Sequence, residues 1–195
     1  MCENAGLLIV FSGPSGAGKD TVLEQLLKKS EIQKSISATT RERRPEEKDG
    51  VDYRFVTKEQ FLSMIENNEM LEYTQYVGNY YGTPKGPVQE WTQKGKDVLL
   101  KIEVQGGAAI KKLMPDSIGI FIMPPSLEEL ERRLRSRGTD DDAAIKKRLE
   151  TAVEEIKYSK NYDFIVVNDQ VADAVEEIKR IIKQVKNERK NSKEC

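Results

Sequence analysis

The chain has 195 residues, 33% of them charged, and 32 basic against 33 acidic side chains leave a net charge of -1. That length suits one domain with an ample core, and the balanced charge excludes a global field toward nucleic acid or membranes, so an anion site has to be built locally. Histidine is absent and the two cysteines are Cys2 and Cys195. These counts argue against imidazole chemistry, a zinc site or a structural disulfide, and favour a reducing, cytoplasmic location.

Apolar runs and amphipathic segments alternate along the chain. The runs "LLIVF", "DVLLKI", "IGIFIM" and "DFIVV" are typical of buried strands in a largely parallel sheet, and the first is too short to span a membrane. It carries no basic flank or cleavage site of a leader peptide. Helical spacing of apolar residues follows at 22–27, 127–134, 145–156 and 171–185, and Ser126 with Glu129 predicts a capping box. Strands alternating with helices predict an α/β fold around a largely parallel central sheet flanked by helices.

Two stretches break this alternation. Residues 35–83 predict short strands around one helix, and residues 137–142 form a Gly- and Asp-rich connector. We expect both to be insertions on a single-domain core. That core is expected to comprise three segments, residues 6–34, 84–136 and 143–187. Residues 188–195 have no apolar face and are expected to fray.

The stretch "FSGPSGAGKDTV" carries the most specific motif. It follows an apolar strand, opens a helix and matches the phosphate-loop pattern G-x-x-x-x-G-K-[ST] through Lys19. Its glycines let successive backbone N–H groups face phosphates at a helix N-terminus, and Lys19 supplies a mobile charge. The dinucleotide fingerprint G-x-G-x-x-G is not matched. We therefore predict a nucleoside triphosphate site formed by Gly13, Pro14, Ser15, Gly16, Ala17, Gly18, Lys19, Asp20 and Thr21.

The last position of the pattern should be a hydroxyl that helps to hold magnesium, yet it is Asp20, and Thr21 follows. A bare carboxylate about 5 Å from a phosphate charge costs on the order of 3 kcal/mol at an effective dielectric of about 20. Asp20 either points away and stabilises the first helical turn by roughly 0.3–1 kcal/mol, or approaches Mg²⁺ directly or through water.

A second polar cluster lies in "SISATTRERRPEEKDGVDYRF". Arg41, Arg43 and Arg44 offer planar forks that pair with phosphate oxygens, and neighbouring hydroxyls complete such a shell. The interleaved acids weaken a nucleic-acid interpretation, and a solvated charge run is the alternative. Further on, "LEYTQYVGNYYGT" combines a carboxylate, hydroxyls and aromatic rings. This combination suits a planar base but equally a half-buried strand edge, and composition does not decide between them.

The motifs taken in order resemble the guanylate kinase family. They are GPSGAGK, SISATTR with a second arginine three residues later, G-x-D-Y, LEY…GNYYGT, I-E-V-Q-G, RLRSRGT and VVND, spread over about residues 6 to 185. The resemblance implies phosphorylation of GMP by ATP with Mg²⁺, and a core with a GMP-binding insertion (35–83) and a lid (137–142). It implies ATP and GMP as partners, no nucleic acid or membrane, and a monomer or homo-oligomer.

The resemblance also implies individual roles. Positions that hold the GMP phosphate are matched by Arg41, Arg44, Tyr53 and Tyr81. Positions that read guanine are matched by Ser37, Glu72 and Thr83, with Glu103 also on the GMP side. Catalytic positions that close on the transferring phosphates are matched by Lys19, Arg133, Arg137 and Arg148. Asn168 matches the position that meets the adenine end of ATP.

Elementary chemistry supports the guanine assignment. One carboxylate at Glu72 can accept from both N1–H and the exocyclic amine of guanine, while a hydroxyl donates to O6. Adenine would leave that carboxylate facing a lone pair, and sites of this kind reject the wrong partner by about 10⁴–10⁵. The absence of histidine also fits, because phosphoryl transfer depends on positioning and charge stabilisation.

Two positions depart from the family pattern. The family has a non-hydroxyl residue such as glycine at position 20 followed by Thr or Ser, which favours Thr21 over Asp20 beside the metal. It has an acid where this chain has Lys101, a lysine that could pair with Glu103 or face a phosphate.

Two other functions fit the sequence less well. Inactive guanylate-kinase-like modules that bind phosphorylated partners lose the loop lysine and lid arginines, whereas Lys19, Arg133 and Arg137 are present here. A kinase for AMP or CMP is disfavoured by Glu72 with Ser37.

Overall fold

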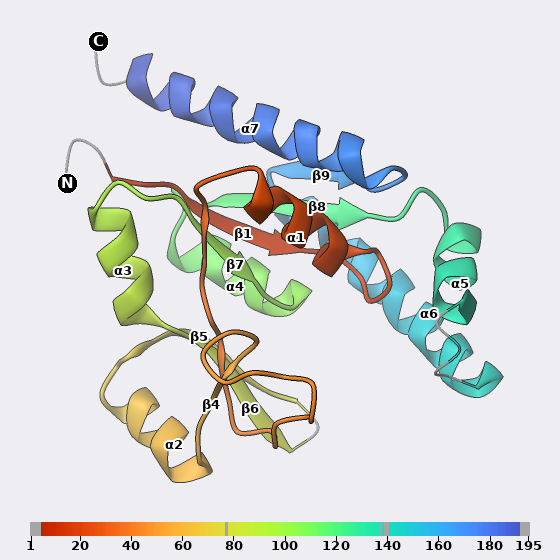
Figure 1. Ribbon diagram of the computed structural model, residues 1–195, viewed down its shortest axis with the longest axis horizontal. Coiled ribbons are helices and arrows are strands. Elements are labelled where there is room, and N and C mark those ends of the chain that lie inside the picture. Colours follow the sequence, from red (N-terminus) through yellow and green to blue (C-terminus); the bar gives the residue numbers. More distant parts are fainter. Residues whose placement is uncertain (1–4, 77, 137, 139–140, 192–195) are drawn as a thin grey trace.

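A central parallel sheet organises the protein. The computed structural model describes residues 5–76, 78–136, 138 and 141–191. Five strands lie in the order β2-β7-β1-β8-β9, and every neighbouring pair is parallel (Figure 1). Their bounds are β1 Leu8–Ser12, β2 Gln33–Lys34, β7 Val98–Lys101, β8 Ile118–Met123 and β9 Phe164–Val167. The four predicted strands are confirmed, and only the two-residue β2, which carries no apolar run, was missed.

Alternate residues of β1 fill two cores. Ile9 and Phe11 pack with helices α1 (Lys19–Lys28) and α7 (Val171–Asn191) on one face of the sheet. Leu8 and Val10 pack on the other face with α3 (Lys85–Gln93) and α4 (Val104–Leu113). Both faces are therefore buried, as the continuous apolar runs predict. The helices α3 and α4 were not predicted, because Gly and Pro interrupt their apolar spacing.

A second sheet forms a separate lobe below the first in Figure 1. Its order is β4-β3-β6-β5, with β3 Ala38–Thr39, β4 Arg54–Phe55, β5 Met70–Tyr76 and β6 Asn79–Pro84. Helix α2 (Lys58–Glu66) packs on it through Phe61, whose ring stacks on Tyr80 at a centroid distance of 5.4 Å. Residues 35–83 thus contain short strands around one helix, as predicted.

Helices α5 (Leu127–Ser136) and α6 (Asp142–Ile156) project to the right in Figure 1, and a 3₁₀ helix (Lys157–Asn161) follows them. They pack together through a small apolar cluster that includes Leu134 and Ile145. Ser126 caps α5 by accepting from the Glu129 N–H at 3.1 Å. The Glu129 carboxylate instead pairs with Arg132 and Arg133, so the predicted capping box is only half formed.

Helix α7 continues to Asn191. Residues 188–191, which were expected to fray, are therefore helical, and that prediction was wrong for this segment. Arg189 donates to the Asp116 carbonyl, which ties the end of the helix to the loop before β8. None of the helices within the described ranges is long and apolar enough to cross a membrane.

Candidate active site

The phosphate loop connects β1 to α1 at the carboxyl edge of the sheet. Gly16 and Gly18 have φ angles of 87° and 83°, a region that side chains other than glycine rarely enter. A Cβ at Gly16 would lie 2.8 Å from Leu130 Cδ1, and one at Gly18 would lie 2.4 Å from Asn168 Nδ2. Both positions therefore require glycine for backbone conformation and for space, which supports the identification of the loop.

Asn168 lies beneath this loop. Its side chain is 2% exposed, and its Nδ2 donates to the Ala17 carbonyl at 2.8 Å. The backbone carbonyl of Asn168 accepts from Arg133 Nη2 at 2.9 Å, so Arg133 is linked to the loop through Asn168. Within the described part of the chain, Asn168 Oδ1 has no hydrogen-bond partner. The buried amide of Asn168 thus supports the loop, and its predicted contact with the adenine end of ATP stays a prediction.

Lys19 folds back onto the loop. Its ammonium donates to the carbonyls of Gly13 and Pro14 at 2.6 and 2.9 Å. Burial lowers the pKa of Lys19, opposed by the negative charges of Glu103 and Glu155. The ammonium is therefore already located among the groups that would surround a phosphate.

Glu155, on α6, is a neighbour of the loop that the sequence did not reveal. Its Oε2 accepts from the Ser15 backbone N–H at 3.1 Å. Burial raises the pKa of Glu155, and the negative charge of Glu103 acts in the same direction. Its only sequence signal is the spacing from Arg148, which lies seven residues earlier on the same helix and hence on the same face.

Asp20 and Lys101 form an ion pair, with Lys101 Nζ 2.5 Å from Asp20 Oδ1. Desolvation acts to raise the pKa of Asp20, but the hydrogen bond from Lys101 and its charge outweigh this and leave the pKa lowered. For Lys101, desolvation acts to lower the pKa, but the bond to Asp20 leaves it raised. Of the two partners expected for Lys101, Glu103 is not the residue that forms this ion pair, and the contact with a phosphate stays a prediction. The two departures from the family pattern neutralise each other.

The predicted phosphate-binding residues of the insertion gather around Arg41. Its guanidinium lies over the Tyr53 ring at 5.6 Å, and the rings of Tyr53 and Tyr81 meet edge to face at 6.2 Å. Glu47 accepts from Arg41 Nη2 at 2.6 Å and from the Arg44 backbone N–H at 3.0 Å. Glu47 therefore orders this loop, while the exposed side chain of Arg44 points its charge to solvent.

The three predicted base-reading residues also lie together. Glu72 and Thr83 pair across β5 and β6, and Thr83 Oγ1 donates to Glu72 Oε1 at 2.7 Å. Ser37 precedes Ala38, which pairs with Gly82, so Ser37 lies level with Thr83. Burial raises the pKa of Glu72, opposed by the hydrogen bonds from Thr83. A Cβ at Gly106 of α4 would lie 3.2 Å from Glu72 Oε2, so α4 closes one side of this carboxylate.

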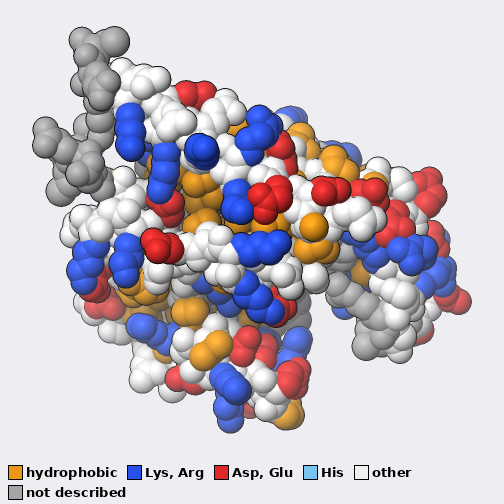
Figure 2. Space-filling view, turned by 45° about the horizontal axis from the view of Figure 1, so that its top comes forward, with side chains coloured by type: hydrophobic (Ala, Val, Ile, Leu, Met, Phe, Trp, Pro, Cys, Tyr) orange, Lys and Arg blue, Asp and Glu red, His pale blue; other side chains and the backbone are white. Residues whose placement is uncertain are grey.

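The remaining arginines come from the projecting helices. Arg133 on α5 pairs with Glu129 at 2.7 Å, and Arg148 is half-buried on α6. Arg137 lies outside the described residues, as does much of the predicted lid at 137–142. In Figure 2 the surface is hollowed between the lobe of the second sheet and the projecting pair α5 and α6, and charges of both signs are interspersed over this face.

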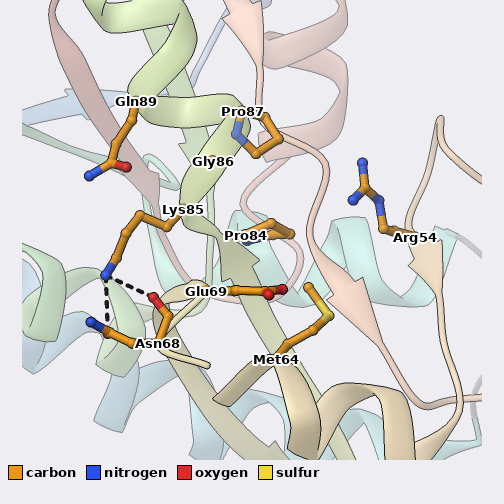
Figure 3. A pocket seen from close by; sticks show the side chains of 9 residues that line it. All are labelled: Arg54, Met64, Asn68, Glu69, Pro84, Lys85, Gly86, Pro87 and Gln89. Atoms are coloured by element: carbon orange, nitrogen blue, oxygen red, sulfur yellow. Dashed lines mark hydrogen bonds between the residues drawn. The ribbon is translucent and has the colours of Figure 1, made fainter. Parts of the chain in front are cut away.

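A separate hollow of about 320 Å³ lies where the second sheet joins α3 (Figure 3). Its lining includes Arg54, Met64, Glu69 and Lys85, and Lys85 Nζ donates to Asn68 Oδ1 at 3.0 Å. None of its lining residues belongs to the predicted nucleotide site. It lies at the connection between the second sheet and the core.

The fold and the loop define a P-loop α/β protein that binds nucleotide phosphates. The family model described as guanylate kinase matches residues 6–185. A guanylate kinase of Clostridioides difficile is 51% identical over 188 residues, which cover 96% of this chain and 92% of that protein. One of Latilactobacillus sakei is 51% identical over 182 residues, 92% of this chain and 90% of that protein.

A solved structure supports the same assignment. The guanylate kinase from Anaplasma phagocytophilum superposes with a TM-score of 0.77 and 37% identity, over 94% of this chain and 88% of that one. The chain belongs to the guanylate kinase family.

Proposed function

We propose that this protein phosphorylates GMP with ATP to give ADP and GDP, as a cytoplasmic enzyme of purine nucleotide metabolism. The observation that carries the choice of GMP is the half-buried carboxylate of Glu72, held by the Thr83 hydroxyl at 2.7 Å beside Ser37. That arrangement offers an acceptor for the two donors of guanine and the Ser37 hydroxyl as a donor for O6, and it leaves adenine unmatched.

The two substrates would approach from opposite sides. The backbone N–H groups of the loop, with Lys19, would hold the phosphates of ATP. Arg41 and Tyr53, with Arg44 and Tyr81, would hold the GMP phosphate from the second sheet. Arg133 and Arg148 would stabilise charge on the transferring group, together with Arg137. Phosphoryl transfer needs positioning and charge stabilisation more than a strong base, so the lack of histidine is no obstacle.

Magnesium fits the residues that this chain provides. Mg²⁺ keeps several waters and takes one or two protein oxygens plus substrate phosphates. Thr21 is exposed in the first turn of α1, next to the exposed carboxylate of Asp20. Among the described residues no cluster of three or more His, Cys, Asp or Glu side chains is present, so the phosphates would supply most of the ligands. The ion would neutralise phosphate charge, with the Thr21 hydroxyl as the preferred protein oxygen.

An inactive module that binds phosphorylated partners is not favoured. Such a module needs only the second sheet, whereas Lys19, Glu155 and Asn168 here form an ordered network around the loop. This network keeps the phosphate loop in a shape that can bind ATP, which an inactive module would not need.

A coupled assay that detects ADP tests this function. Purified protein with ATP and Mg²⁺ is offered AMP, GMP, CMP, UMP and dTMP separately. We expect kcat/KM for GMP to exceed that for AMP by about 10⁴-fold or more, the range that unpaired polar groups impose, and GMP to be preferred over the other three as well. Equal turnover with AMP would contradict the guanine assignment, and ATP-independent binding of GMP without turnover would favour the inactive module.

A further inference from the structure

Lys101 is brought to the phosphate loop by the sheet. It ends β7, and its register partner in β1 is Phe11, two residues before Gly13 of the loop. From there its ammonium reaches the Asp20 carboxylate at 2.5 Å. The two residues are 81 positions apart in the chain, so the parallel pairing of β1 and β7 creates this contact.

Of the two side chains in this ion pair, Asp20 is the one that is largely exposed to solvent. The side chain of Asp20 is 82% exposed and that of Lys101 is 30% exposed. Exposed ion pairs are screened and contribute little to stability. Asp20 therefore orients Lys101 without holding it strongly against an anion of higher charge.

The charge of Lys101 also acts on groups in both halves of the site. Lys101 is close enough to Lys19 in the loop, and to Tyr53 just before β4, to act on the pKa of each. The charge of Lys101 also interacts with the positive charge of Lys34 and the negative charge of Glu103. A cation placed between the triphosphate loop and the acceptor-phosphate cluster is located where a phosphoryl group would cross.

We propose that Lys101 is a phosphate-binding residue of the nucleotide site, held in place by Asp20 until a nucleotide phosphate replaces the carboxylate as its partner. The proposal rests on the proposed function, because it is the transfer from ATP to GMP that brings phosphate groups between the loop and the second sheet. The exchange forms one ammonium–phosphate contact and breaks one ammonium–carboxylate contact, with no covalent step. It gives this chain a second mobile cation beside Lys19.

The test uses a bisubstrate probe in which five phosphates join adenosine to guanosine through their 5′ oxygens. Its affinity is measured by calorimetry without magnesium for Asp20→Asn and for Asp20→Asn combined with Lys101→Met. Both proteins lack the carboxylate, so its repulsion of phosphate cancels from the comparison. We expect the double variant to bind at least about tenfold more weakly, as loss of a charge-assisted hydrogen bond implies. Equal affinity would overturn the proposal and leave Lys101 as a neutraliser of Asp20.

Further measurements separate phosphate contact from support of the fold. Asp20→Asn alone should bind the probe at least as tightly as the wild type, and weaker binding would mean that the intact pair, not an exchange, is needed. Guanosine affinity should be equal in all variants, and a parallel loss would assign Lys101 to the structure of the base site. Lys94→Met is the matched control, because Lys94 forms an equally short exposed pair with Glu90 on α3.

The result for Lys101 can be distinguished from the result for GMP phosphorylation. Wild-type turnover of GMP is measured in the coupled assay, whereas the probe reports binding alone. A protein that fails to phosphorylate GMP would overturn the proposed function while the comparison of the two variants still decides the role of Lys101.

Discussion

The carboxylate of Glu155 accepts a hydrogen bond from the backbone N–H of Ser15 at 3.1 Å, which joins α6 to the phosphate loop. The same helix carries Arg148, so a helix that borders the hollow in Figure 2 also holds the loop. This contact makes the shape of the loop depend on a residue 140 positions away.

The first prediction concerns that hydrogen bond. Glu155→Ala leaves a partly buried N–H without its acceptor and should cost about 1 kcal/mol, or about 2–4 °C in melting temperature for a chain of this size. Glu155→Gln keeps an acceptor and removes a charge that burial disfavours, so we expect little change. Glu154→Ala, on the solvent side of α6, is the control, and calorimetric melting compares all three. An equal loss in Glu154→Ala would contradict a specific role for Glu155.

The second prediction separates the two substrate sites. Lys19→Ala should abolish phosphoryl transfer, because the ammonium that would neutralise ATP phosphates is lost, while GMP affinity stays within about twofold. Titration calorimetry with GMP and the coupled assay measure the two effects. Lys28→Ala, an exposed residue of the same helix paired with Glu24, serves as the control. If GMP binding fell as far as activity, the assignment of two separate sites would be wrong.

The third prediction concerns base specificity. Glu72→Gln should weaken GMP and lower the GMP-to-AMP ratio of kcat/KM by at least about tenfold, since an amide accepts on one side only and brings a donor toward N1–H. Arg44→Ala removes a phosphate partner and should weaken GMP and AMP alike. An unchanged ratio in Glu72→Gln would refute the base-reading role.

The fourth prediction follows from the raised pKa of Glu72, which burial causes. Between the ordinary glutamate value of about 4.3 and the raised folded value, the native carboxyl holds more protons than the unfolded one. Its ionisation therefore costs stability as pH rises through this window, while GMP affinity, which needs the carboxylate, falls as pH drops through it. The difference between wild type and Glu72→Gln in GMP affinity against pH isolates this group, because the phosphate titration is common to both. Parallel pH profiles of GMP affinity for the wild type and Glu72→Gln would contradict this prediction.

The sequence predicted the fold wherever periodicity was unbroken. The run "LLIVF" became the central strand, and the loop glycines proved to occupy left-handed conformations. Helix α4 was missed because "VQGGAAIKKL" carries two adjacent glycines, which local propensity disfavours but packing against the sheet overrides. The end of α7 was misjudged because Arg189 finds its partner in a distant loop.

Site residues that belong to a local sequence motif could be predicted from the sequence. Residues whose contacts come from distant parts of the chain could not. Glu72 and Thr83 lie together because strand pairing makes them neighbours, which their spacing around a turn already suggests. Glu155 has no motif of its own, and the hydrogen bond from Asn168 Nδ2 to the Ala17 carbonyl depends on burial of the amide against the loop. The pairing of Asp20 with Lys101 depends on strand order, which no local pattern encodes.

The last prediction returns to Asp20 and Thr21 at the start of α1. Before a nucleotide binds, Lys101 neutralises Asp20, so the carboxylate has a partner of opposite charge without any need for a metal. Thr21, one residue further into the helix, keeps an exposed hydroxyl of the kind that serves magnesium in phosphate loops. Titrating Mg²⁺ at fixed ATP, we expect Thr21→Ala to raise the midpoint for activity by about tenfold and Asp20→Gly to change it by less than about twofold. Thr21→Ser, which keeps the hydroxyl, is the matched control and should titrate as the wild type does. A large rightward shift in Asp20→Gly alone would instead place the carboxylate at the metal, and Lys101 would then be the residue that keeps it in position before magnesium arrives.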